Sequence, residues 1–161
     1  MIPTLTTDRL TLRAPTLADW PAYRDFYRAD LTRHTGSYDD KTAWRLFASD
    51  AGHWMLHGFG WFIVDDGTGP VGACGLHHPP HQADVEIGWN TFEPALNRGY
   101  ATEAATRVLA WGRGLVGPTR IVSYIDRDNG ASQAVATKLG ARDTGQAAAH
   151  NPACNVWEHR P

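Results

Sequence analysis

The sequence lacks the features that mark several specialised classes of protein. It has only two cysteines, Cys74 and Cys154, which are too few for a disulfide framework and are not at metal-ligand spacing, so we expect two thiols packed in the core. It has no run of about 20 apolar residues, which a membrane-spanning helix needs. It also has no basic-then-apolar leader, so we expect a cytoplasmic protein with no membrane partner.

The chain also lacks an excess of either charge and any internal repeat. The formal net charge is −2 and the pI is near 6.4, so no broad positive field is available for nucleic acid and we expect no such partner. No linker rich in Pro, Gly or Ser divides the 161 residues, of which 42% are hydrophobic and 20% charged. We therefore expect residues 1–161 to form a single globular domain.

Hydrophobic periodicity predicts a mixed α/β domain. The expected strands cover residues 5–13, 60–65, 71–76, 83–89 and 120–125, with two weaker strands within 142–160. The expected helices cover residues 20–27, the segment from 39 to Gly58, the segment from Tyr100 to Gly112 or Gly114, and residues 132–139. Asp19 is the expected N-cap of the first helix, because Pro21 is tolerated only in a first turn.

One segment, residues 86–104, has a pattern that suits anion binding. A strand leads into a loop that contains Gly99, and a helix begins directly after it. A helix N-terminus presents unpaired N–H groups and an effective charge of about +0.5, so phosphate groups bind there readily. Gly99 lets the backbone approach a ligand closely, Ala101 keeps the turn open, and Arg98 adds a positive charge.

Four segments together resemble GNAT acetyltransferases of the RimJ/RimL type. They are T-D-R-L-T-L-R-A-P-T-L-A-D from Thr7, E-I-G-W from Glu86, R-G-Y-A-T-E-A from Arg98 and N-G-A-S-Q-A-V-A-T-K-L-G from Asn129, and they cover nearly the whole chain in order. The resemblance implies a GNAT fold: a central, mixed, mostly antiparallel sheet of six or seven strands with splayed central strands, flanked by about four helices. It also implies acetyl-CoA as co-substrate, no metal, and an amine as acceptor.

The resemblance implies two groups of residues that bind acetyl-CoA. Backbone amides at the start of the helix from Tyr100 would hold the pyrophosphate. The strand that contains Glu86 and the start of the helix near Ser132 would hold the pantetheine arm. The first group is Asn97, Arg98, Gly99, Tyr100, Ala101 and Thr102. The second group is Ile87, Gly88, Trp89, Asn129 and Ser132. The loop departs from the family pattern at Leu96, where Gln or Arg is common, and at Asn97, where Gly is common, although Asn tolerates left-handed backbone geometry.

Two residues are candidates for the chemistry of acetyl transfer. Glu86 aligns with a strand carboxylate that serves as general base in some GNAT enzymes; alternatively, it is a strand Glu paired with Arg or Lys on a solvated face. Many members carry a Tyr acid where this chain has Ala136. In RimJ/RimL-like sequences a Ser stands one turn earlier, so we assign Ser132 as the hydroxyl donor near the sulfur, the alternative being a helix-capping Ser.

Other conspicuous side chains have simpler explanations. His77, His78 and His81 lie in a Pro-containing loop without suitably spaced Cys or carboxylate partners, so we expect no metal site. Thr102 and Glu103 are typical of any helix start. Among seven tryptophans, Trp61 and Trp89 are expected to border the acceptor cleft. Three charged residues either line that cleft or form a solvated helix face. They are Asp25, Arg28 and Asp30.

The sequence leaves the acceptor open. The resemblance suggests protein N-terminal amines or small-molecule amines. The alternatives are a detoxifying acetyltransferase for an antibiotic or polyamine, and a catalytically silent acyl-CoA-binding module, which the absence of Tyr at Ala136 and the unusual Leu96 would favour. The aromatic-rich first helices suit a possible homodimer.

Overall fold

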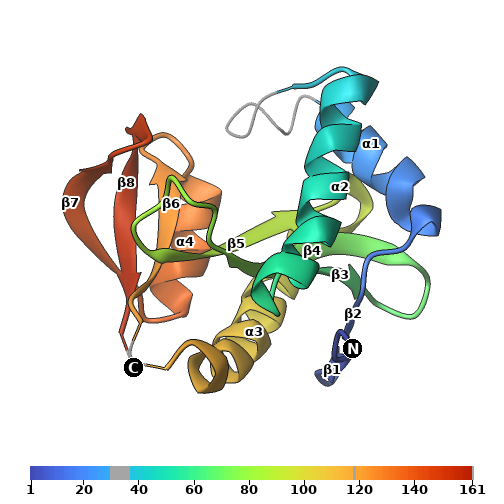
Figure 1. The fold of residues 1–161 in the computed structure, drawn as a ribbon, viewed down its shortest axis with the longest axis horizontal. Coiled ribbons are helices and arrows are strands. Elements are labelled where there is room, and N and C mark those ends of the chain that lie inside the picture. Colours follow the sequence, from blue (N-terminus) through green and yellow to red (C-terminus); the bar gives the residue numbers. More distant parts are fainter. Residues whose placement is uncertain (30–36, 118, 161) are drawn as a thin grey trace.

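The structure is a computed structural model that describes residues 1–29, 37–117 and 119–160. Within these ranges four α-helices surround one eight-stranded sheet (Figure 1). The strand order is β1-β2-β3-β4-β5-β6-β8-β7, and all neighbours are antiparallel except β5 and β6. This confirms the mixed α/β class and the mostly antiparallel sheet that the family resemblance implied.

The elements follow the predicted order along the chain. The strands are β1 (Leu5–Thr6), β2 (Thr11–Arg13), β3 (Trp61–Asp65), β4 (Pro70–His77), β5 (Val85–Thr91), β6 (Ile121–Asp126), β7 (Arg142–Ala148) and β8 (Asn151–His159). The α-helices are α1 (Trp20–Arg28), α2 (Asp40–His57), α3 (Tyr100–Val116) and α4 (Gly130–Lys138). The described residues also form two short 3₁₀ helices, η1 (Leu17–Asp19) and η3 (Glu93–Ala95).

The first predicted strand, residues 5–13, is a short hairpin rather than one strand. Thr7 N donates to the carbonyl of Leu10 at 2.9 Å, and the hydroxyl of Thr7 accepts from Leu10 N at 3.0 Å. The side-chain hydroxyl thus supports a tight turn in the middle of the segment. The turn divides the segment into β1 and β2, and this division raises the strand number from the expected six or seven to eight.

Asp19 stands at the predicted N-cap position of α1, but its side chain does not cap that helix. One carboxylate oxygen, Oδ2, accepts from the backbone N–H of Thr16 at 2.8 Å and closes the turn of η1. The other oxygen, Oδ1, forms an ion pair with Arg13 at 2.7 Å. Asp19 therefore fastens the start of α1 to β2, which a capping pattern in the sequence does not reveal.

Helix α3 continues through both glycines that were expected to end it. Gly112 has a packing role, since a Cβ there would lie 2.5 Å from Cδ1 of Leu76 on β4. The helix ends at Val116, where Gly117 has a φ of 59° and a ψ of −131°, a positive-φ backbone that glycine adopts readily. A glycine inside a helix thus marks a close helix-to-sheet contact here.

The central strands part as predicted. β4 and β5 pair over six residues, whereas β5 and β6 pair only at Val85↔Ile121 and Glu86↔Val122. Beyond this point, which we call the fork, β5 runs with β1–β4 and β6 runs with β7 and β8 (Figure 1). None of the described helices is long and apolar enough to cross a membrane.

Candidate active site

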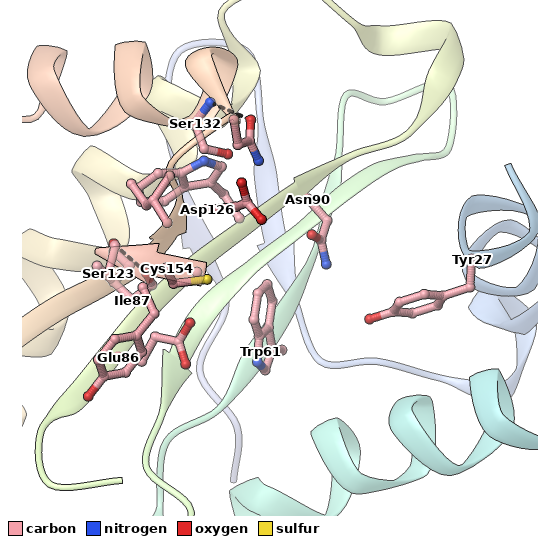
Figure 2. Close-up of a pocket in the computed structure, with 14 residues that line it drawn as sticks. Tyr27, Trp61, Glu86, Ile87, Asn90, Ser123, Asp126, Ser132 and Cys154 are labelled. Carbon is pink, nitrogen blue, oxygen red and sulfur yellow. Dashed lines mark hydrogen bonds between the residues drawn. The ribbon is translucent and has the colours of Figure 1, made fainter. Parts of the chain in front are cut away.

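A cavity of about 190 Å³ opens at the fork (Figure 2). Strands β5 and β6 form its walls, and α1, β3, α4 and β8 each contribute side chains. Its lining residues are Tyr27, Trp61, Glu86, Ile87, Gly88, Trp89, Asn90, Ser123, Tyr124, Ile125, Asp126, Asn129, Ser132 and Cys154. The fork cavity thus brings together the predicted base, the predicted hydroxyl donor and the predicted pantetheine-binding residues, together with Trp61.

Glu86 lies on β5 with its carboxylate in this cavity. Gln82 Nε2 donates to its Oε2 at 3.0 Å, and among the ion pairs of the described residues none involves Glu86. Burial raises the pKa of Glu86 to about 7. A carboxyl group with this pKa can take up and release a proton near neutrality, as a general base must. The alternative of a solvated Glu paired with Arg or Lys does not describe this environment.

A second carboxyl group near Glu86 was not identified from the sequence. Asp50 lies on α2, and the hydroxyl of Tyr23 donates to its Oδ2 at 2.6 Å. Burial, with a smaller contribution from the charge of Glu86, raises the pKa of Asp50 to about 7 against the lowering effect of the Tyr23 hydrogen bond. Two acidic groups therefore titrate together near neutrality. In the sequence Asp50 reads only as a polar position on an amphipathic helix, so no local pattern could have revealed it.

Asn129 and Ser132 also line the fork cavity, at the start of α4, and Ser132 lies toward the end away from Glu86 (Figure 2). Asn129 Oδ1 accepts from the backbone N–H of Ser132 at 3.1 Å, so Asn129 is the N-cap of this helix. The capping role considered for Ser132 therefore belongs to Asn129. Among the described residues, the Ser132 hydroxyl has no hydrogen-bond partner, and it is available to a ligand in the cavity.

The N-terminus of α3 has the backbone that anion binding needs. Asn97 has a φ of 62° and is the non-glycine residue with positive φ in the described chain, while Gly99 has a φ of 79° and is the N-cap. The first bond of the helix runs from Glu103 N to Gly99 O at 3.1 Å. The preceding amides, residues 97–102, have no helical carbonyl to pair with. Asn97 thus adopts the left-handed conformation for which Gly is common at this position in the family.

Side chains around this loop hold it in place. The hydroxyl of Tyr100 donates to Oδ2 of Asp66 at 3.2 Å, and Arg98 lies 3.9 Å from the same oxygen with its side chain 55% exposed. Arg9 Nη1 donates to the Arg98 carbonyl at 3.1 Å. The carboxylate of Glu103 accepts from Arg9 Nε at 2.7 Å, so Glu103 has the structural role expected of a first-turn carboxylate.

The loop and the fork cavity are separate, and Asn90 on β5 connects them. Residues 97–102 do not line the fork cavity. Tyr100 and Ala101 line a smaller cavity beside β4 and β5, and Asn90 lines both cavities. A ligand that contacts both the α3 N-terminus and Glu86 would therefore pass Asn90, a residue that sequence reasoning missed.

The charged residues of the first helix do not line the fork cavity. Asp25 pairs with Arg24 at 2.8 Å, and Arg28 pairs with Asp40 at 2.8 Å. They form the solvated helix face that was the alternative interpretation. Asp30 lies outside the described residues.

The loop that contains His77, His78 and His81 is joined to helix α2 through His53. The His78 backbone N–H donates to His53 Nε2 at 3.0 Å, and His53 Nδ1 therefore carries the proton that it shares with the Phe59 carbonyl at 2.6 Å. Burial lowers the pKa of His53 and lowers that of His77 to about 4, so both rings are neutral at neutral pH. In the described part of the chain, no group of three or more His, Cys, Asp or Glu side chains is arranged to hold a metal ion.

Known proteins are similar to this chain in sequence and fold. The family profile for the acetyltransferase (GNAT) domain matches residues 9–142. A crystal structure of an acetyltransferase from Agrobacterium tumefaciens is 34% identical and superposes with a TM-score of 0.94 over 100% of this chain and 96% of that one. An uncharacterized N-acetyltransferase of Bacillus subtilis, YoaA, is 28% identical over 90% of this chain and 86% of the relative.

A more distant structure shares the fold. RimL, a ribosomal-protein alpha-N-acetyltransferase solved in complex with coenzyme A, is 16% identical and has a TM-score of 0.71 over 98% of this chain and 97% of its own. The family match covers most of the chain, and the splayed sheet agrees with it. The chain therefore belongs to the GNAT acetyltransferases, and it is an acetyl-CoA-dependent acyltransferase.

Proposed function

We propose that this enzyme transfers the acetyl group of acetyl-CoA directly to a primary amine, and that the reaction takes place in the fork cavity. The observation that carries the proposal is that Glu86, Asn129 and Ser132 line this one cavity, with Glu86 and Ser132 toward different ends of it (Figure 2). A base and a hydroxyl donor toward different ends of one space suit a reaction in which an amine loses a proton and a thiolate gains one.

The α3 N-terminus and the β5 strand are proposed to bind acetyl-CoA. The unpaired amides of residues 97–102 and the helix dipole of α3 would hold the pyrophosphate. Beyond the fork, the backbone of Gly88 and Trp89 lacks a partner strand on the β6 side and would pair with the amide groups of the pantetheine arm. Asn129 uses Oδ1 for its helix cap, so its Nδ2 remains to donate to the arm.

Glu86 is proposed as the general base and Ser132 as the general acid. Glu86 would take one proton from the ammonium group, so that the neutral amine attacks the thioester carbonyl carbon. As the new C–N bond forms and the C–S bond breaks, the Ser132 hydroxyl would donate its proton to the departing sulfur and regain a proton from the nitrogen, which loses its second proton on becoming an amide. Glu86 then releases the first proton to solvent. No covalent enzyme intermediate is required.

The acceptor is proposed to be a protein N-terminal amine or a small-molecule amine. An α-amine has a pKa near 8, closer to neutrality than a lysine side chain near 10.4, so it needs less help from a base. RimL acts on the N-terminus of a ribosomal protein, and its fold is shared, which supports including peptide α-amines among the candidates. A screen of peptides, polyamines and aminoglycosides, with thiol release as the readout, tests the proposal. Acetyl-CoA binding without turnover on any amine would contradict it.

Ser132→Ala tests the assigned acid. With an acceptor found by the screen, we expect a fall in kcat of roughly 10- to 100-fold, because the leaving sulfur loses its donor. The affinity for acetyl-CoA should change less. Thr137→Val on the same helix, whose hydroxyl donates to the Gln133 carbonyl at 2.8 Å, is the matched control. An unaltered rate in Ser132→Ala would remove Ser132 from the chemistry.

A further inference from the structure

At the fork, a side-chain hydrogen bond takes the place of a backbone hydrogen bond between β5 and β6. In a continued parallel ladder the carbonyl of Ile87, the residue after the last pair, would accept a backbone N–H from β6. Instead, Ser123 Oγ donates to this carbonyl at 2.7 Å (Figure 2). A side chain of β6 therefore satisfies the last β5 carbonyl before the strands part.

The same hydroxyl contacts His159 on β8, with Ser123 Oγ and His159 Nε2 2.9 Å apart. A hydroxyl has one proton, and a carbonyl can only accept, so the Ser123 proton points to Ile87. His159 Nε2 must then donate to Ser123 Oγ, which fixes the tautomer of the ring. Burial lowers the pKa of His159 to about 4, and the ring is therefore neutral at neutral pH.

The two residues connect three strands, and both are buried. Ser123 and His159 are each 3% exposed. His159 stands opposite Ile121 in the β6–β8 ladder, and its ring lies edge-on to Trp89 of β5 with the ring centroids 6.3 Å apart. Within the described chain, His159 Nδ1 is buried without a hydrogen-bond partner. A buried nitrogen without a partner is costly, so the ring is retained here at some expense to stability.

We propose that Ser123 and His159 are a positioning pair that holds the β5–β6 fork open at a fixed angle, so that the β5 backbone from Gly88 to Asn90 is pre-organised for the pantetheine arm. Although Ser123 lines the fork cavity, its hydroxyl is engaged by Ile87 and His159, so the proposed role requires no contact with the reacting atoms. The pair acts through Ile87 and Trp89, which it holds from the β6 and β8 side. Pre-organisation lowers the ordering cost that a ligand would otherwise meet on binding.

This inference rests on the proposed binding of the pantetheine arm at the fork, and it makes a selective prediction. Ser123→Ala leaves the Ile87 carbonyl without its donor, so the strand loses its fixed position. We expect the affinity for acetyl-CoA to fall about five- to tenfold, the effect of one lost hydrogen bond. The affinity for 3′-phospho-ADP should stay within about twofold, because this ligand has the phosphates but no pantetheine arm to reach the fork.

Three further variants complete the calorimetric titrations. Ser123→Thr keeps the hydroxyl and should restore most of the acetyl-CoA affinity. His159→Phe keeps a ring beside Trp89 but removes the donor, and it should weaken acetyl-CoA binding in the same selective way. Thr144→Val is the matched control, since the Thr144 hydroxyl also donates to a strand carbonyl, that of Val156 at 2.9 Å, but this bond joins β7 to β8 and does not involve β5.

The outcomes separate this inference from the proposed function. If the parent protein binds acetyl-CoA and Ser123→Ala and His159→Phe bind it equally well, the positioning role is wrong while the proposed function stands. If both variants lose acetyl-CoA and 3′-phospho-ADP to the same extent, the pair is merely structural and the inference is again overturned. If the parent protein does not bind acetyl-CoA, the proposed function itself fails.

Discussion

At the scale of single residues, Glu86 bears most of the proposed chemistry. The carboxylate must be ionised to accept a proton, and its pKa is raised to about 7. We therefore expect kcat/KM to rise with pH through about 7. Glu86→Gln should lower turnover by roughly 10²- to 10⁴-fold and remove this inflection, while the Kd for acetyl-CoA is retained. Steady-state kinetics across pH 5.5 to 8.5 measures both effects.

The control for Glu86 is Glu93→Gln on η3, an exposed residue that does not line the fork cavity. This substitution should leave the rate and the pH profile unchanged. Equal turnover in Glu86→Gln and the parent enzyme would show that Glu86 is not the base.

Asp50 supplies a prediction about stability. Its folded pKa of about 7 lies above the ordinary value of 3.8, so the native state binds more protons than the unfolded state between these two values. The free energy of unfolding should therefore lose a contribution as the pH rises through this window. Asp50→Asn keeps an acceptor for Tyr23 and should stabilise the protein at pH 8 by on the order of 1 to 3 kcal/mol, with little effect at pH 4.

Urea unfolding of both proteins at several pH values tests this difference directly. Comparing the two proteins cancels the opposite trend from the neutral histidines, whose lowered pKa values favour the native state as the pH rises. Asp25→Asn, on the exposed face of α1, is the control and should change stability by less than about 0.5 kcal/mol at any pH. A destabilised Asp50→Asn at pH 8 would contradict the stated environment.

At the scale of elements, two glycines of α3 should respond differently to substitution, because one packs against the sheet and the other does not. Gly112→Ala would place a Cβ 2.5 Å from Leu76 Cδ1, so the helix or the leucine must move, and we expect a destabilisation of about 1 to 3 kcal/mol. Gly114→Ala meets no atom within 4 Å. It should stabilise the helix by up to about 1 kcal/mol. Thermal unfolding of the pair measures this contrast, and equal effects would show that α3 is not packed closely against β4.

The order of elements was predictable because most of them have a clear local period or end signal. Gly58 ends α2 with a φ of 73°, and the D-D-G-T-G-P segment joins β3 to β4, both as the local rules require. The local rules failed where the partner is distant in sequence or is another layer. The continuation of α3 past Gly112 is such a case, because Gly112 contacts Leu76 of β4. The hairpin at Thr7 is a different kind of failure, because Thr7 and Leu10 are three residues apart and the alternating pattern of residues 5–13 did not indicate the turn.

The candidate site was predictable only in part for the same reason. Glu86, Asn129 and Ser132 stand in segments that resemble a family, so their meeting in one cavity could be expected. Ser123 and His159 are 36 residues apart and lie in no motif, and their contact depends on the pairing of β6 with β8. Such contacts depend on the register of the paired strands, which cannot be predicted reliably from a single sequence.

At the scale of the whole molecule, one long ligand is proposed to connect the N-terminus of α3 with the fork. The amides at the N-terminus of α3 and the backbone beyond the fork are separated by Asn90, and they belong to different parts of the sheet-and-helix framework. A ligand bound only at the α3 N-terminus would make no use of the parted strands, and a ligand bound only at the fork would leave the amides unpaired. A molecule with a pyrophosphate at one end and a flexible amide-containing arm at the other fits both.

The most direct test of this central claim is a calorimetric titration of the purified protein with acetyl-CoA. The account predicts a saturable heat with one site per chain and a Kd in the micromolar range, about −8 kcal/mol. No saturable heat at roughly 1 mM acetyl-CoA, corresponding to binding weaker than about −4 kcal/mol, would contradict it.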